Sequence, residues 1–364
     1  MIYIHFPFCR SFCTYCGFYS ETVSGCGGRS FESWTGQVCE EASRRTGEIL
    51  ATKGIDTLYF GGGTPSLLSL DCIDRILEAL PGGRGHRYSE FTLECNPDDI
   101  SRELCRALAG AGVNRISMGV QSFDDGVLRW MNRRHDARGA RGAFEMLRME
   151  GFDNISIDLI FGISGMDDAL WRRSIEEAVA LSPEHISAYQ LSVEPGSALA
   201  GKVERGEYRE APDSQCSRQY ELLCRMLSDA GYSHYEVSNF ALPGRESIHN
   251  SAYWKRVPYV GLGPGAHSFD GDRTRLWNSE ELSGWSASGE TLGDEDMRVE
   301  TLMLGLRTAA GLDAQWIAEN CDGATVSRLL GEGALAIVDK KSGTRLRIPE
   351  NHFFVSDEII RELI

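Results

Sequence analysis

Residues 3–16 read YIHFPFCRSFCTYC, and Cys9, Cys13 and Cys16 within them follow the pattern C-x3-C-x2-C. Thiolates are soft ligands that suit zinc or the iron of an iron–sulfur cluster. A closed structural zinc site uses four protein ligands, whereas a working metal centre keeps one position open. The three cysteines therefore predict a [4Fe–4S] cluster with one iron that has no protein ligand and can bind a small molecule.

Two other interpretations of these cysteines remain open. Free cysteines pack well as small apolar side chains, so the three thiols could simply be buried or incidental. A structural zinc site would need a fourth ligand near Cys16, and the spacing differs from the paired C-x2-C units of ordinary zinc sites.

Strand patterns and helix patterns alternate along the first two thirds of the chain. The six predicted strands cover residues 1–6, 57–60, 90–95, 114–120, 155–161 and 186–191. Helical spacing of apolar residues predicts helices at 31–50, 72–80, 100–111, 124–133, 137–150, 168–181 and 214–230. Such alternation implies parallel pairing and an α/β fold, and six units are too few to close an eight-stranded barrel.

The cysteine pattern, framed by Tyr3, His5 and Pro7, resembles the signature of the radical SAM family. Within that family it resembles the oxygen-independent coproporphyrinogen III oxidase-like group. The oxidases carry a further cysteine two residues after the third, and Phe18 stands at that position, as in the haem-chaperone (HemW-like) branch. The resemblance implies a partial (β/α)6 barrel and a [4Fe–4S] cluster whose open iron binds S-adenosylmethionine (SAM). It also implies reductive cleavage of SAM to a 5′-deoxyadenosyl radical.

We expect three regions along the chain. Residues 1–231 would form the radical SAM partial barrel. Residues 232–293 are rich in aromatics, Gly, Pro and Asn and predict an irregular segment packed across the barrel mouth. Residues 294–364 predict a small, mainly helical, winged-helix-like domain, with a two-stranded wing at about 334–354 and a last helix.

The SAM contacts are expected at the carboxyl ends of the strands, where parallel α/β folds collect their chemistry. Consecutive glycines let backbone N–H groups approach a ligand, a guanidinium suits a carboxylate, and an acid within an apolar run needs a partner. The resemblance implies that SAM is bound by Tyr3, Tyr15, Gly62, Gly63, Thr64, Glu94, Gln121, Arg133 and Asp158.

Some of these assignments have alternatives. Glu94 could be a solvated residue at a strand end, and the glycines could form a simple turn. Arg134 is adjacent to Arg133, and a single family position favours Arg133. After the fifth strand, residues 162–165 read GISG where the family usually has Gly-Ile-Pro-Gly, so this turn lacks the fixed φ of proline.

Residues 249–254 read HNSAYW and resemble the H-N-x-x-Y-W motif of the haem-chaperone branch. We expect His249, Tyr253 and Trp254 to contact haem, because imidazole ligates haem iron and aromatic rings suit a flat macrocycle. The alternative for His249 is a hydrogen-bonded structural residue, and His267 is a second candidate ligand. Covalent attachment of the c type is not predicted, because the chain has no C-x2-C-H.

The chain has 364 residues, 42% hydrophobic residues and a net charge of −16, which argues against a general nucleic-acid binder. Its eleven cysteines are an odd number, and the eight outside the cluster stretch, from Cys26 to Cys321, show no second ligand spacing. This usage favours a reducing compartment. Since neither a secretory signal nor a membrane-spanning run is visible, we expect a cytoplasmic protein.

The predicted function is a haem chaperone that binds haem as cargo, delivers it to haemoproteins, and retains SAM binding without coproporphyrinogen oxidase activity. Its expected partners are haem, acceptor haemoproteins and an electron donor, with no nucleic acid and no transmembrane segment; a transient membrane contact stays open. The alternative is an oxygen-independent coproporphyrinogen III oxidase, in which a SAM-derived radical abstracts a propionate β-hydrogen and loss of carbon dioxide leaves a vinyl group. Phe18 and the HNSAYW stretch favour the chaperone.

Overall fold

The computed structural model describes residues 1–25, 30–52, 54–340 and 343–364. Cys26, one of the eight cysteines outside the cluster stretch, lies outside the described residues. The other ten cysteines are free thiols.

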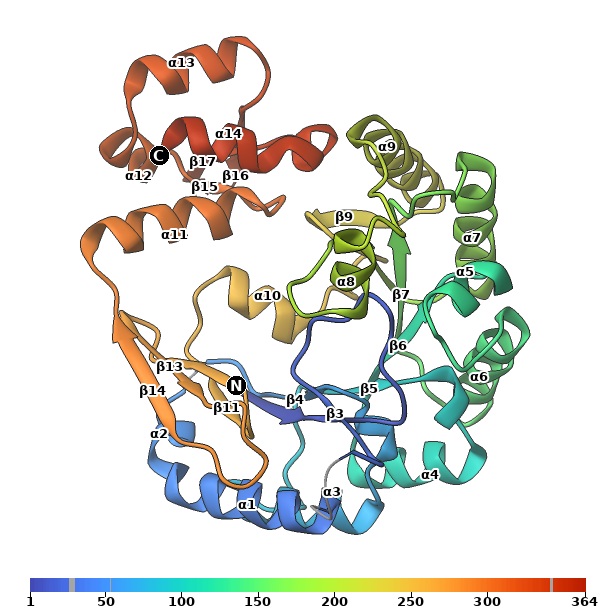
Figure 1. The fold of residues 1–364 in the computed structure, drawn as a ribbon. Helices are drawn as coiled ribbons and strands as arrows, with labels where there is room; N and C mark the ends of the chain where they lie inside the picture. The colour runs from blue at the N-terminus through green and yellow to red at the C-terminus, as the bar shows by residue number, and fades with distance from the viewer. Residues whose placement is uncertain (26–29, 53, 341–342) are drawn as a thin grey trace.

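One nine-stranded sheet forms the centre of the molecule, in the order β11-β1-β4-β5-β6-β7-β8-β10-β9 (Figure 1). Six consecutive members of this sheet pair in parallel. They are β1 (Ile2–Phe6), β4 (Thr57–Gly62), β5 (Glu90–Cys95), β6 (Arg115–Gln121), β7 (Ile155–Phe161) and β8 (His185–Gln190). These six strands confirm the predicted partial (β/α)6 barrel.

The helices that connect the strands lie mostly on the outside of the sheet (Figure 1). They are α1 (Phe31–Arg44), α2 (Thr46–Ala51), α3 (Leu70–Ala79), α4 (Arg102–Ala111), α5 (Asp125–Trp130), α6 (Ala137–Met149), α7 (Asp168–Leu181), α8 (Ala198–Glu204) and α9 (Asp213–Asp229). Of these, α8 packs on the loop after β1, where the Leu199 N–H donates to the Thr14 carbonyl at 2.7 Å (Figure 1). Most begin at a Ser or Asp whose side chain accepts a hydrogen bond from a first-turn N–H, as Ser101 does from Leu104. The predicted helix 31–50 is divided at Arg45 into α1 and α2.

Successive side chains of each barrel strand point to opposite faces, and this separates an apolar outer face from a polar interior. On β1, Ile4 and Phe6 are fully buried, and the Phe6 ring packs edge-on against Trp34 of α1 at 5.1 Å. Tyr3 and His5 lie on the opposite face of β1, because successive side chains of a strand alternate. The interior of the barrel therefore presents hydroxyl, imidazole and carboxyl groups, and this is where the candidate site lies.

Residues 232–293 are more regular than the sequence analysis expected. They contain β9 (Ser233–Glu236), β10 (Asn239–Ala241), α10 (Ile248–Trp254), β11 (Val260–Leu262), β12 (His267–Phe269), β13 (Thr274–Asn278) and β14 (Ala287–Thr291). β11 pairs in parallel with β1, and β10 pairs antiparallel with β8, so the segment extends both edges of the barrel sheet. Strands of three to five residues carry too little periodicity to be recognised in sequence, although they cover the unpaired edges of an open barrel.

The C-terminal region consists of α11 (Asp294–Leu306), β15 (Leu312–Asp313), α12 (Ala314–Asn320), α13 (Gly323–Gly331), β16 (Ala336–Lys340), β17 (Gly343–Arg347) and α14 (Ser356–Leu363). Its small sheet has three strands rather than the expected two, with β17 in the middle. The wing ends at Arg347, and Glu350–Val355 is a 3-10 helix.

The turn after β7, where serine replaces the proline usual in the family, is held by a different contact. Gly162 and Gly165 have positive φ angles of 73° and 87°. The Ser164 N–H donates to the Tyr208 hydroxyl at 3.0 Å, a hydrogen bond that proline could not form. None of the helices in the described part of the chain has the length and apolar character that a membrane span requires.

Candidate functional site

The three motif cysteines lie in the loop that follows β1, at the carboxyl end of the barrel. Cys9 ends β2 (Phe8–Cys9), which pairs with β3 (Glu21–Thr22). Farther along the loop, the Thr14 N–H donates to the Met131 carbonyl at 3.0 Å. These backbone bonds anchor the loop at two places, so the three half-buried thiols are held in a defined position.

The environment of the thiols fits the binding of an iron–sulfur cluster. Burial and, to a lesser degree, the neighbouring Cys13 and Cys9 thiols raise the pKa of Cys16 to about 11, and the Arg133 guanidinium opposes this rise. Among the described residues, no three His, Cys, Asp or Glu side chains are grouped to hold a single metal ion. A [4Fe–4S] cluster sets no such requirement, because each cysteine binds a different iron.

Gly62 and Gly63 hold the start of the cysteine loop against the end of β4. Gly62 has a φ of 106°, and a Cβ on Gly63 would lie 2.6 Å from the Phe8 carbonyl oxygen. The Gly63 N–H donates to the Phe6 carbonyl at 2.7 Å, and the Thr64 N–H donates to the Phe8 carbonyl at 2.8 Å. The sequence analysis expected these N–H groups to face a ligand, but they are used within the protein. The segment can therefore offer carbonyl oxygens, which accept hydrogen bonds from an ammonium group.

Glu94 is a half-buried, hydrogen-bonded carboxyl group rather than a solvated strand end. Burial raises its pKa to about 7, although the Tyr59 hydroxyl opposes this rise by donating to Oε1 at 2.8 Å. The other carboxyl oxygen accepts from the Gly62 N–H at 3.2 Å. The carboxyl group is thus fixed beside the glycine segment, and its charge changes near neutral pH.

Arg133 places a buried guanidinium directly beside the cysteine loop. Its Nη1 donates to the Cys13 sulfur at 3.3 Å, and its Nη2 donates to the Asn96 side chain and the Gly119 carbonyl. Its Nε is buried and has no hydrogen-bond partner among the described residues. An unpaired buried donor costs about 1–3 kcal/mol, so this nitrogen is suited to an acceptor on a ligand. Arg134 instead pairs with Asp99 at 3.1 Å.

Gln121 has a backbone conformation that its sequence context did not reveal. Its φ is 68°, and the register of β6 against β7 shifts between Gly119 and Gln121. A left-handed conformation in a residue other than glycine costs about 1–3 kcal/mol and is concentrated at functional sites. The bulge therefore turns the end of β6 at the position where a ligand contact was predicted.

Asp158 is a half-buried carboxyl group in the barrel interior, and serines supply the partners that an acid within an apolar run needs. Ser117 and Ser156 donate to its carboxyl group at 3.2 and 3.4 Å. Burial raises the pKa of Asp158, and these hydroxyls counteract the rise. Asp158 in turn contributes to the raised pKa of Glu94, so the two carboxyl groups are near each other.

The two predicted tyrosines border the same region. Tyr15 is half-buried beside Arg133, Cys13 and Cys16, and burial of its hydroxyl raises the pKa of that group. The Tyr3 ring lies 6.0 Å from the ring of Tyr59, which holds Glu94. Through these neighbours, the two tyrosines belong to the same region around the cysteine loop as the other predicted SAM residues.

Tyr59 and Asn96 also belong to this region, although neither was among the residues predicted from the sequence. Tyr59 fixes Glu94, and Asn96 joins two predicted residues by donating to the Thr64 hydroxyl at 3.3 Å and accepting from Arg133. The position of Asn96, directly after the predicted strand that ends at Cys95, is the signal that could have identified it.

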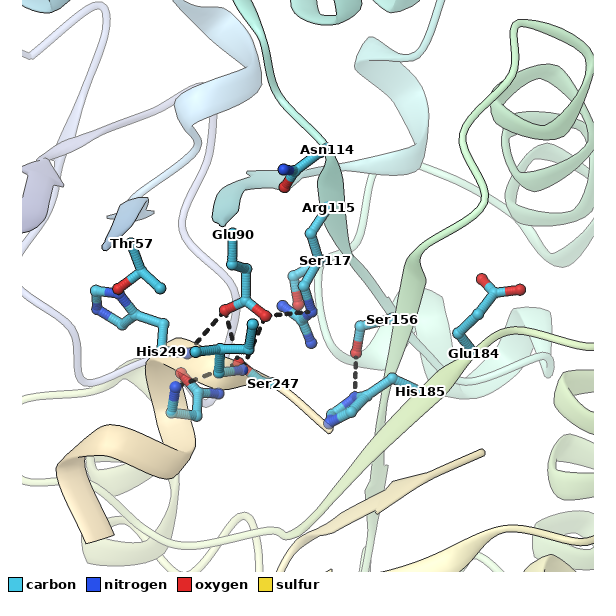
Figure 2. Close-up of polar contacts among 12 residues, drawn as sticks. Thr57, Glu90, Asn114, Arg115, Ser117, Ser156, Glu184, His185, Ser247 and His249 are labelled. Atoms are coloured by element: carbon cyan, nitrogen blue, oxygen red, sulfur yellow. Dashed lines mark hydrogen bonds and ion pairs between the residues drawn. The ribbon is translucent and has the colours of Figure 1, made fainter. Parts of the chain in front are cut away.

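His249 lies at the opposite end of the barrel, in the buried polar network of Figure 2. Its two ring nitrogens are hydrogen-bonded to the Thr57 and Tyr253 hydroxyls at 2.9 and 3.0 Å, and only 1% of its surface is exposed. Burial lowers the pKa of His249 to about 3. These are the contacts of the hydrogen-bonded structural histidine that the sequence left open as the alternative, and both ring nitrogens are already used within the protein.

The same buried network also holds the N-terminus of α10 at this end of the barrel. Glu90 accepts hydrogen bonds from the N–H groups of Ile248 and His249, both at 2.8 Å, and from the Ser247 hydroxyl (Figure 2). A carboxylate at a helix N-terminus is stabilised by the unpaired N–H groups there. Arg115 lies 4.0 Å from Glu90. The first residues of β5 and β6 thus fix the N-terminus of α10.

Known proteins resemble this chain over most of its length. Residues 3–178 match the radical SAM superfamily. The haem chaperone HemW of Bacillus subtilis is 35% identical over 335 residues, which cover 87% of this chain and 86% of that protein. The haem chaperone HemW of Mycobacterium tuberculosis is 34% identical over 377 residues, with coverage of 100% and 94%.

A solved structure with the same fold is that of the Escherichia coli coproporphyrinogen III oxidase HemN. It superimposes with a TM-score of 0.79 at 21% identity, and the match covers 100% of this chain and 89% of that chain. At this level of identity the likeness establishes the fold.

Proposed function

The chain belongs to the radical SAM superfamily and, within it, to the HemW group, and from this membership we propose that it is a haem-binding chaperone that holds a [4Fe–4S] cluster and SAM. It would receive haem as cargo and deliver it to acceptor haemoproteins in the cytoplasm. Two features carry the metal and SAM part of this proposal. Three free thiols lie in one loop, and beside them the Nε donor of Arg133 has no hydrogen-bond partner among the described residues. The haem part is supported by the relatives' similarity over nearly their whole length.

The residues of the site suit the two ends of an amino acid. Glu94 and the carbonyl groups of Gly62 and Gly63 would accept hydrogen bonds from the ammonium group of SAM. Arg133 would donate to its carboxylate, since a guanidinium is the preferred partner of that group. These contacts would orient SAM beside Cys9, Cys13 and Cys16, and the chemistry that the cluster supplies when bound is one-electron reduction.

The remaining predicted residues would hold the nucleoside part of SAM. Gln121 and Asp158 can hydrogen-bond ribose hydroxyls, and Tyr15 offers an aromatic face to the adenine. An electron donor is a further partner under this proposal.

Binding of SAM should weaken as the pH falls through about 7, because Glu94 then takes up a proton and no longer attracts an ammonium group. We expect Glu94→Gln to bind SAM about tenfold more weakly at pH 8 and to lose most of this pH dependence. Calorimetric titration of the anaerobic protein with SAM between pH 6 and 8 measures both effects. As a matched variant, Tyr59→Phe removes a hydrogen bond that lowers the pKa of Glu94, so the midpoint should move to higher pH. Identical pH profiles for wild type and Glu94→Gln would show that Glu94 does not bind the ammonium group.

A haem titration tests the chaperone proposal. The reconstituted protein should bind haem saturably at about one per chain. Anaerobic incubation with coproporphyrinogen III, SAM and a reductant should leave that porphyrinogen unchanged. Formation of protoporphyrinogen IX at a useful rate would instead support the oxidase alternative. Comparing the haem titration with and without the cluster would show whether the cluster is needed for binding.

A further inference from the structure

A cavity lies between the cysteine loop, the end of α10 and α11, and Tyr3 joins it to the region proposed to bind SAM. Its volume is about 670 Å³, which falls within the range of roughly 300–1,000 Å³ typical of small-molecule sites. A second cavity, between β8 and the C-terminal region, has only about 270 Å³. Figure 1 shows α10 inside the arc formed by the barrel, the β12-β13-β14 sheet and α11. Segments far apart in the sequence therefore enclose the larger space.

Aromatic side chains form much of the wall of this cavity. Tyr253, Tyr259 and Phe269 line it, and the rings of Tyr253 and Tyr259 meet edge-on with centroids 4.7 Å apart. Phe18 lies on the side of the cysteine loop and is 73% exposed. Flat aromatic faces favour a flat, largely apolar ligand such as a porphyrin.

Two histidines line the cavity, and their hydrogen bonding differs. Both ring nitrogens of His5 are occupied, by the Tyr3 hydroxyl at 3.1 Å and the Tyr19 carbonyl at 3.0 Å. His267 is exposed, and its ring stacks on Trp277 at 6.4 Å. Within the described part of the chain, the ring of His267 has no hydrogen-bond partner. Of the two, His267 has the nitrogen that is available to a metal.

The backbone around His267 fixes its position. β12 pairs antiparallel with β13 and brings His267 opposite Trp277. On the other side, a Cβ on Gly261 would lie 2.0 Å from the His267 carbonyl oxygen, so only glycine allows β11 and β12 to approach so closely. The imidazole is therefore presented from a rigid strand.

Guanidinium groups stand at the rim. Arg256 follows α10 with a φ of 54°, and Arg275 lies on β13; both pair with Glu300 of α11. Arg275 also lies 3.5 Å from Glu290. Arginines at the edge of an aromatic cavity suit the carboxylates of a porphyrin, which would compete with these glutamates.

From these contacts we propose that the cavity is the haem site, that His267 is the axial ligand of the iron, and that His249 is a positioning residue. His249 would act through its 3.0 Å hydrogen bond to Tyr253, which aims that ring at the cavity. The proposal rests on the haem binding proposed above. In this assignment the HNSAYW stretch contributes to the wall of the haem site, and none of its residues binds the iron.

Matched histidine variants test this assignment in the full chain with the cluster reconstituted. We expect His267→Ala to shift the haem absorption band and to weaken haem binding at least about tenfold, and added imidazole to restore the band. His249→Gln should keep the wild-type position of the band, because the iron keeps its ligand, but should weaken haem binding, because Tyr253 loses its hydrogen bond. The absorbance of the iron–sulfur cluster, which should be unchanged in both variants, reports on folding.

A second variant tests the cavity without touching a histidine. Leu304→Trp adds bulk from α11 into the space and should weaken haem binding while the cluster content stays the same. A wild-type band and affinity in both His267→Ala and Leu304→Trp would overturn the site, as would loss of the axial signature in His249→Gln alone. Wild-type protein that binds no haem would contradict the proposed function itself, so the two failures are distinguishable.

Discussion

Replacing Cys9, Cys13 or Cys16 with serine should abolish the iron–sulfur absorbance of protein reconstituted anaerobically with iron and sulfide. A hydroxyl is a poor substitute for a thiolate toward iron, and the site has only three protein ligands to begin with. Iron should fall from about four per chain to well below one in each single variant. Iron and sulfide analysis, together with the absorbance spectrum, measures the loss.

Cys321→Ser is the matched control for these variants. Cys321 is a half-buried free thiol in the C-terminal region, at the end of α12. Its replacement should leave the iron content unchanged. Unaltered iron in all three motif variants would contradict the ligand assignment, as would stoichiometric zinc held by four ligands in wild-type protein.

Replacing Arg133 with alanine should reduce the affinity for SAM by about 100-fold, which corresponds to about 3 kcal/mol. The variant removes the unpaired Nε donor proposed to bind the SAM carboxylate. It also leaves the Asn96 side chain and the Gly119 carbonyl without their buried partner. Arg133→Lys keeps the charge but loses the planar fork, so its affinity should lie between those of wild type and alanine.

Arg134→Ala is the control, because the neighbouring guanidinium pairs with Asp99 and is partly exposed. Such pairs contribute little, about 0–1 kcal/mol, so SAM binding should hardly change. Equilibrium binding of SAM to reconstituted protein measures all three variants, and iron analysis reports whether the cluster survives, since Arg133 also contacts Cys13. Equal affinities of Arg133→Ala and Arg134→Ala would exclude the carboxylate role.

Much of the fold could be predicted because its signals are local. The bounds predicted for β5, β7 and α7 match the structure residue for residue, since alternation of apolar residues and helical spacing are properties of short segments. The three-cysteine pattern is equally local and indicated the family by itself. The short strands β9, β10 and β11 were not predicted, because pairing with the edges of the barrel sheet defines them rather than their own periodicity.

The sequence by itself determined the class of protein: the cysteine spacing, the alternation of strands and helices, and the residue types at the strand ends. The tertiary structure decided which of those residues are available to a ligand. Thr57, which occupies one ring nitrogen of His249, is 192 residues away along the chain. Among the described residues, the ring nitrogens of His267 have no hydrogen-bond partner, although its setting in the sequence looked less favourable. Availability depends on the neighbours that folding brings to each polar atom, because a hydrogen bond formed within the protein removes that atom from ligand binding.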